Sequence, residues 1–348
     1  MRVRWARCDP FDPSLASWRR LREGSSCPAR SSSPRLRSLY DLVAIAPPDE
    51  EQEAWVHDVR VASRRFVEAL EMARSILPEE EAQKANRRAK RLRRRLGRTR
   101  ELDVVCSDFR NLALRLGLPE VTVERVEDIV FSQRDAASAY ALGALPEAKI
   151  QKHRDAAEAL SFHNVRPDIA WRDLAAEHLA RRSQEAEDLI PTIEDPSLTE
   201  QHHRLRIRIK RLRYALELAE ELISPLTDPR PLLRSTRRMQ DSLGILNDAA
   251  DLKAFLRRDD VTFILGRFRD PALEEATAVQ ARRFSETATL VRAKASATFG
   301  LVRRVAGRMG LFQRTELRGG VKPPSVARQV IPELLQLAQD PNGRLFVP

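Results

Sequence analysis

The chain carries one unusual arrangement of residues twice, and this internal repeat limits what the chain can fold into. The first copy, HDVRVASRRFVEALE, runs from His57 to Glu71, and the second copy, HRLRIRIKRLRYALE, runs from His203 to Glu217. The two copies are 146 positions apart throughout. Solenoid repeats are only about 20–45 residues long, so a period of this length predicts two packed units and not a solenoid.

The composition favours a folded protein with an anionic partner. The 348 residues are 42% hydrophobic, which supports a sizeable core, and 61 Lys and Arg outnumber 50 Asp and Glu to give a net charge of +11. Such a charge indicates nucleic acid, polyphosphate or an acidic membrane surface as the partner. The three cysteines have no paired spacing and are expected to be free thiols in a reducing compartment. They are Cys8, Cys27 and Cys106.

Hydrophobic periodicity predicts an all-α protein. From about residue 50 to 310, apolar residues recur at steps of three and four, and alternating β-branched runs are absent. Prolines should interrupt the helices near positions 78, 119, 146, 191, 196, 225–231 and 271. No apolar run approaches the roughly 20 residues that span a bilayer, and the N-terminal residues lack a signal-peptide core. We therefore expect a cytoplasmic protein without a membrane span.

A second landmark extends the duplication. The segment LGRTRELDV starts at Leu96 and the segment LGILNDAAD starts at Leu243. Gly97 follows His57 by 40 positions and Gly244 follows His203 by 41, so one insertion separates two collinear copies. We predict a tail over residues 1–33, a duplicated domain over 34–310 with repeats at 34–162 and 166–310, and a C-terminal extension over 311–348.

The repeated segment places its basic residues on one side of a helix. Positions i, i+3 and i+7 lie within about 60° of one another, and apolar residues take the opposite side of both copies. The first stripe holds His57, Arg60 and Arg64, with Arg65 at its border. The second stripe holds His203, Arg206 and Lys210, with Arg211 at its border. A single histidine is more often a structural hydrogen-bonding group, but the repeated stripe favours an anion site.

The next helix of the first repeat is still more basic. Between Lys84 and Arg100, ten of 17 residues are Lys or Arg and none is acidic, whereas the second repeat has only Arg234, Arg237 and Arg238. Like charges four residues apart destabilise a helix by a few tenths of a kcal/mol per pair. Arginine suits phosphate because its planar fork donates two parallel hydrogen bonds. The alternative is that each arginine simply faces water.

The other residues near the two landmarks, and the isolated histidines, have structural interpretations. Gly97 and Gly244 are expected at a helix end or a close contact. Nearby acids either hold arginines through ion pairs or cap helices; these are Glu101, Asp103, Asp248 and Asp251. The remaining isolated histidines are expected to be surface or core hydrogen-bonding groups; these are His153, His163 and His178.

Enzyme motifs are missing. His57-Asp58 matches the His-Asp pair of helical metal-dependent phosphohydrolases, but no histidine precedes His57, and Arg204 replaces the aspartate in the second copy. The sequence has no di-iron Glu-x-x-His pair, phosphate loop or nucleophile elbow. We therefore expect no catalytic residues, no metal site and no cofactor.

The segment Val56–Arg65, paired with His203–Tyr214, resembles the CHAD family, named for its conserved histidine α-helical domain. Gln240–Asp248 is similar to the second landmark of that family, and the likeness covers about residues 34–310. It implies two antiparallel four-helix bundles related by a pseudo-twofold axis, with a basic cleft between them. It also implies binding of inorganic polyphosphate at polyphosphate granules, without catalysis.

By matching position, the resemblance assigns the polyphosphate-binding residues. They are His57, Arg60, Arg64, Arg65, Lys90, Arg91, Arg94, His203, Arg206, Lys210, Arg211, Arg237 and Arg238. The chain departs from the family pattern at Arg100-Glu101, where Arg-Asp is expected, and in a degenerate first helix around residues 34–46. Relatives often carry a triphosphate-tunnel β-barrel, but residues 79–83 lack the lysine that its Glu-x-Glu-x-Lys motif requires.

Two other functions stay open from the sequence. One is binding of RNA or another nucleic acid through its backbone, although aromatics are 5% of the chain and only Tyr214 stands among the basic stripes. The other is a scaffold that brings granule-associated proteins together, which is compatible with polyphosphate binding.

Overall fold

The computed structural model describes residues 52–75, 77–143 and 171–318. Every regular element in these ranges is a helix, and none is a strand, so the predicted all-α class is confirmed for the described part of the chain. The predicted tail at 1–33, the degenerate segment at 34–46, the end of the first repeat and most of the C-terminal extension lie outside the described residues.

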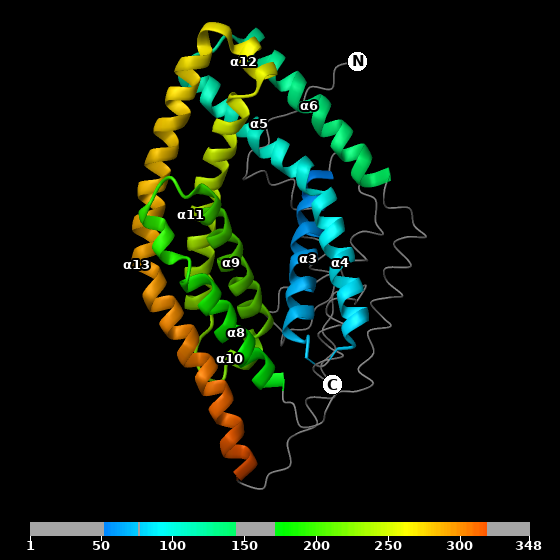
Figure 1. Ribbon diagram of the computed structural model, residues 1–348, viewed down its shortest axis with the longest axis vertical. Coiled ribbons are helices and arrows are strands. Elements are labelled where there is room, and N and C mark those ends of the chain that lie inside the picture. The colour runs from blue at the N-terminus through cyan, green and yellow to red at the C-terminus, as the bar shows by residue number, and fades with distance from the viewer. Residues whose placement is uncertain (1–51, 76, 144–170, 319–348) are drawn as a thin grey trace, which may run out of the picture. The chain divides into compact units, whose positions relative to one another are not determined.

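The helices follow one another in two groups (Figure 1). The first repeat contains α3 (Gln52–Met72), α4 (Glu79–Arg95), α5 (Gly97–Leu116) and α6 (Glu120–Gly143). The second contains α8 (Trp171–Glu187), η3 (Ile190–Glu194), α9 (Thr199–Leu218), α10 (Glu220–Ile223), α11 (Arg230–Leu256), α12 (Asp259–Leu265), η4 (Gly266–Phe268) and α13 (Arg269–Arg318).

Proline and glycine mark the helix ends. Pro78, Pro119 and Pro229 each stand immediately before a helix, at the start of α4, α6 and α11. Pro271 lies in the first turn of α13, where its missing N–H needs no partner. Helix α5 ends at Gly117, whose φ of 61° lies in the left-handed region that favours glycine. The prolines thus interrupt the described helices where the sequence predicts.

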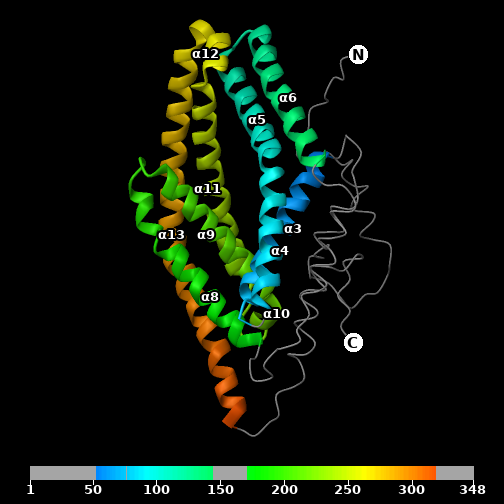
Figure 2. The same ribbon diagram turned by 45° about the vertical axis from the view of Figure 1, so that its right-hand side comes forward.

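Four helices of the second repeat form a ring of neighbours. Helix α8 packs on α9, α9 on α11, α11 on α13, and α13 on α8. Figure 2 shows these helices side by side after the molecule is turned. In the first repeat, α3 packs on α4 and α5 packs on α6. The pseudo-twofold relation between two complete bundles stays a prediction.

The two repeats meet along equivalent helices. Helix α3, which carries the first copy of the motif, contacts α9, which carries the second. Helix α5 likewise contacts α11. In the first repeat the helix is interrupted at Leu96, between α4 and α5. In the second repeat α11 continues without interruption through the equivalent glycine, Gly244. The duplicated motif therefore lies where the two halves of the chain touch.

Apolar side chains from both repeats share one core. Val59 and Phe66 of α3 lie in the same buried cluster as Leu205, Ile209 and Leu212 of α9. A second cluster joins α5 and α6 to the end of α11, to α12 and to the start of α13, with Phe109 and Phe255 in edge contact at 6.2 Å between ring centroids. Burial of the apolar side of α3 and α9 fixes the direction in which their basic side points.

Candidate polyanion-binding site

The basic stripes lie on the sides of α3 and α9 that the core leaves open. On α3, Val59 is fully buried, while Arg60 and Arg64 are half-buried. On α9, Ile209 is fully buried, while Arg206 and Lys210 are half-buried. This arrangement confirms the helical periodicity on which the predicted stripes depend.

Four of these cations come together from the two repeats, and we call them the central cluster: Arg60, Arg64, Arg206 and Lys210. Burial and then the charges of Arg64, Arg206 and Arg60 lower the pKa of Lys210 to about 6. Burial and the charge of Arg64 lower the pKa of Arg60 to about 10. Since a cation depresses the pKa of another only at short range, side chains of both repeats point into one region.

Each motif arginine lies over the motif glycine of its own repeat. A Cβ atom on Gly97 would stand 3.2 Å from the Nη1 atom of Arg60, and one on Gly244 would stand 3.5 Å from the Nε atom of Arg206. The glycines therefore make room for guanidinium groups, which confirms the close-contact interpretation. Neither Nη1 of Arg60 nor Nε of Arg206, both buried, has a hydrogen-bond partner within the described residues. An unpaired buried donor costs about 1–3 kcal/mol, which an anion could offset.

The glycine contacts predict unequal effects of adding a methyl group. We expect Gly97→Ala to displace Arg60 and to weaken polyanion binding by about tenfold, because 3.2 Å leaves no room for Cβ without movement of the guanidinium. Gly244→Ala should change the affinity much less, because 3.5 Å is an ordinary contact distance. Calorimetric titration of both variants would check this. Equal effects of the two substitutions would contradict it.

The two motif histidines have different surroundings. His203 Nδ1 lies 2.6 Å from Oδ1 of Asn247, whose amide nitrogen donates to Asp251 at 2.7 Å. This contact makes Nδ1 the donor and leaves Nε2 of His203 for another partner. His57 is exposed on α3. Desolvation lowers the pKa of His57, Asp58 opposes this, and the charges of Arg100 and Arg64 lower it further.

Carboxylates stand beside the central cluster where α5 meets α11. Burial raises the pKa of Asp248, although Arg206, Arg100 and Lys210 act in the opposite direction. Asp251 has a raised pKa because of burial and of its neighbours Asp248 and Glu101. Glu101 in turn stabilises the charged form of Arg60. Ion pairs are formed by Glu101, 3.8 Å from Arg98, and by Asp103, 2.6 Å from Arg134. The ion-pairing interpretation is therefore confirmed for these two acids and stays a prediction for Asp248 and Asp251.

Helix α4 contributes an arginine that is not among the predicted site residues. Burial and the charges of Arg64 and Arg211 lower the pKa of Arg93, so this side chain faces the central cluster. Lys90 lies on the same side, near Glu71 and Arg211. Arg91 and Arg94 are exposed on another side of α4. The buried stripe of α4 marks its inner side, but the sequence does not reveal which flank of that stripe faces the second repeat.

The equivalent part of α11 places fewer cations near the central cluster than α4 does. Arg237 and Arg238 are both exposed, and Arg237 stands 3.7 Å from a carboxylate oxygen of Asp241. Gln240 occupies the position equivalent to Arg93, and its Oε1 atom is buried without a hydrogen-bond partner among the described residues. The basic surroundings of the cluster are therefore asymmetric, with more charge from the first repeat.

The two border arginines are partly neutralised. Arg65 donates from Nε to Oε2 of Glu217 at 3.0 Å, and this ion pair links α3 to α9 across the repeats. Burial and the charge of Arg182 lower the pKa of Arg211, while the carboxylate of Glu68 acts against that shift. Arg65 thus has an ion pair with a carboxylate, whereas no ion pair within the described residues holds any of the four cluster cations.

A buried ionic group fixes α3 against α8 next to Arg211. Glu68 is 2% exposed, and its Oε1 atom lies 2.7 Å from Nε2 of His178 and 2.5 Å from Nε of Arg182. His178 is therefore a core hydrogen-bonding residue, as the sequence suggested. Arg182 also donates to Glu185 at 2.9 Å, which in turn accepts from Arg208 at 2.7 Å.

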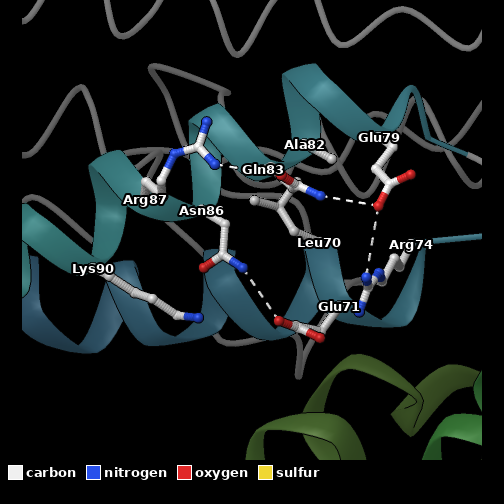
Figure 3. A pocket seen from close by; sticks show the side chains of 9 residues that line it. All are labelled: Leu70, Glu71, Arg74, Glu79, Ala82, Gln83, Asn86, Arg87 and Lys90. Carbon is white, nitrogen blue, oxygen red and sulfur yellow. Dashed lines mark hydrogen bonds and ion pairs between the residues drawn. The ribbon is translucent and has the colours of Figure 1, made fainter.

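A shallow pocket of about 300 Å³ lies between α3 and α4, beyond Lys90 (Figure 3). Asn86 donates to Glu71 at 3.2 Å and Gln83 donates to Glu79 at 2.9 Å. Figure 3 shows both carboxylates among the lining side chains. Arg74, Arg87 and Lys90 also line the pocket and offset these two carboxylates, so the pocket has little net charge and the central cluster is the stronger candidate site.

No group of three or more His, Cys, Asp or Glu side chains within the described residues is placed to hold a metal ion. No helix in the part of the chain that the structure describes is both long enough and apolar enough to cross a membrane.

Comparison with known proteins assigns the family. A search of curated proteins found no match. The family model described as the CHAD domain matches residues 39–257, which is more than half of the chain and includes both copies of the motif and both glycines. Helices α12 and α13 follow the matched range. With its paired histidine helices and the arginines that meet between them, the chain belongs to the CHAD domain family.

Proposed function

We propose that this protein binds inorganic polyphosphate in a basic cleft between two pseudo-twofold-related four-helix bundles. The observation that supports the proposal best is the central cluster, in which Arg60 and Arg64 of one repeat meet Arg206 and Lys210 of the other. Two unit charges about 4 Å apart repel by about 4 kcal/mol at an effective dielectric constant of 20. A linear chain of phosphates would relieve this repulsion in both repeats together.

The chemistry of the cluster favours polyphosphate over nucleic acid at this place. Tyr214, the aromatic residue within the basic stripes, is buried at 3% exposure, so it offers no surface for a base to stack on. RNA bound only through its backbone is the alternative. Guanidinium groups bind phosphate without supplying a nucleophile, so we propose binding without catalysis. A place in the cytoplasm at polyphosphate granules, together with granule-associated proteins, would follow from this ligand.

The salt dependence of binding and competition with RNA should show whether the protein recognises a linear polyanion through its charges. We expect the logarithm of the association constant for long polyphosphate to fall steeply and linearly with the logarithm of the salt concentration, because binding releases counterions as it does on nucleic acids. Titrations at several salt concentrations would measure the slope. In a competition assay, polyphosphate should displace single-stranded RNA of equal total charge from the cluster. Stronger binding of RNA at the cluster would contradict the proposal.

Binding should also depend on pH through Lys210. Its pKa of about 6 leaves it mostly neutral at pH 8, whereas a phosphate beside it favours the charged form. Binding therefore takes up a proton, and the affinity should rise as the pH falls from 8 towards 6, by up to about tenfold per pH unit. Calorimetry in buffers of different ionisation enthalpy would count that proton.

Lys210→Arg is the matched control for this pH dependence. Arginine keeps its charge across the whole range, so the Lys210 contribution to proton uptake should disappear while binding is retained. Proton uptake that is the same in the variant as in the wild type would show that a group other than Lys210 takes up the proton.

A further inference from the structure

Helix α4 and the first turn of α5 carry a second basic surface, on a different side from Arg93. We call it the outer ridge; its side chains are all exposed, and they are Lys84, Arg87, Arg91, Arg94 and Arg98. The first four are three or four residues apart, which places them on one side of α4 along roughly 15 Å. Arg98 follows in the first turn of α5, after the break at Leu96. The central cluster does not account for these residues.

The acidic neighbours of the ridge lie towards its ends. Lys84 pairs with Glu80, whose pKa the charge of Arg87 also lowers, and Nη1 of Arg98 stands 3.8 Å from an oxygen of Glu101. Arg91 and Arg94 have no ion pair with any described residue. Because like charges at this spacing destabilise a helix, the ridge is most stable with an external anion beside it.

The ridge is not part of the duplicated site. The equivalent positions on α11, 147 residues later, are Pro231, Arg234, Arg238, Asp241 and Ile245. Only two of these five are basic, and an acid and an apolar residue replace Arg94 and Arg98. A polyphosphate site built from both repeats would not need such a surface in one repeat only.

An exposed aromatic ring borders the ridge. Tyr140 of α6 is 66% exposed, and the Cζ atom of Arg95 lies 5.8 Å from its ring centroid. Arg98 also reaches α6, where its NH2 atom donates to Gln133 at 3.4 Å. The residues equivalent to Arg95 and Tyr140 in the second repeat are Ser242 and Thr287, a small pair with its two hydroxyl oxygens 2.9 Å apart.

We propose that the outer ridge and Tyr140 form a binding surface for single-stranded nucleic acid, separate from the central cluster. A basic track beside an accessible aromatic ring is the combination that unpaired strands use, with the backbone along the charges and a base against the ring. Polyphosphate has no base to stack, and a duplex hides the faces of its bases. This inference does not depend on polyphosphate binding at the cluster.

The test uses fluorescence anisotropy of the full chain with a labelled oligothymidylate of about 15 nucleotides and with an abasic oligomer of the same length. Tyr140→Ala should weaken oligothymidylate binding about tenfold and leave the abasic oligomer unaffected, because one stacked base contributes about 1–3 kcal/mol. Tyr140→Phe should bind both oligomers as the wild type does.

Two matched double charge reversals distinguish binding at the outer ridge from a general effect of the net charge. Arg87→Glu with Arg91→Glu should weaken both oligomers at least about tenfold, whereas the equivalent Arg234→Glu with Arg238→Glu should change them by less than about threefold. The proposal is wrong if the wild type binds neither oligomer, if both reversals act equally, or if Tyr140→Ala affects both oligomers alike. It is also wrong if Arg60→Glu with Arg206→Glu removes oligothymidylate binding.

Discussion

Arg60→Glu combined with Arg206→Glu should abolish polyphosphate binding, with a loss of affinity of at least about 1,000-fold. Both guanidinium groups lie in the central cluster, and each has a buried nitrogen without a hydrogen-bond partner among the described residues. Removing one charged partner from a buried pair costs about 2 kcal/mol or more, and a glutamate in its place adds repulsion towards phosphate. Calorimetric titration with polyphosphate of defined length would measure the loss.

The control must carry the same change in net charge. Arg125→Glu with Arg269→Glu alters two exposed arginines on α6 and α13 and should change the affinity little at moderate salt. His57→Ala with His203→Ala should give an intermediate loss, because it removes two donors and reverses no charge. Unchanged retention of polyphosphate by the Arg60 and Arg206 double variant would rule out the central cluster as the site.

Glu68→Ala should lower the free energy of unfolding by about 3–5 kcal/mol, the largest stability effect we expect. The substitution leaves Arg182, itself 3% exposed, in the interior without its closest carboxylate. Urea unfolding followed by circular dichroism would measure the change. The exposed pair Arg204 and Glu200 provides the control, since Glu200→Ala should cost less than about 1 kcal/mol.

The same buried group should make the fold sensitive to acid. Burial alone would raise the pKa of Glu68, but His178 and Arg182 together lower it below 4.5; burial lowers the pKa of His178 below 6.5. For Glu68 and His178 alike, the pKa in the folded state therefore lies below the pKa in the unfolded state. Their contribution to the free energy of unfolding is fully present above the unfolded-state pKa, and it is lost as the pH falls through the folded-state pKa. An unfolding free energy that stays constant from pH 7 to 4 would contradict this.

The sequence predicts the parts of this site that depend on local periodicity. The stripes of α3 and α9 follow from the three- and four-residue spacing of His57, Arg60 and Arg64, because burial of the opposite side leaves only one orientation. The glycines could be recognised as close contacts from their repeated position. In each case the relevant neighbours lie within one repeat.

What the sequence does not reveal depends on distant packing. The family resemblance assigns Arg91 and Arg94 but not Arg93. Periodicity does not add Arg93, because it identifies the buried stripe of α4 but not the helix beside each flank of that stripe. The partnership of Glu68 with His178 joins residues 110 positions apart and breaks the symmetry of the repeat, since Tyr214 occupies the position equivalent to Glu68. Such contacts follow from tertiary structure alone.

The common core of α3 and α9 has a consequence for how such a chain could arise. Val59 and Phe66 share their buried cluster with Leu205 and Ile209, which come from the other half of the molecule. An ancestor of half the length would have lacked this part of the cluster unless two copies of it associated. Gene fusion would then have turned an intermolecular contact into an intramolecular one, after which the two halves were free to diverge in charge.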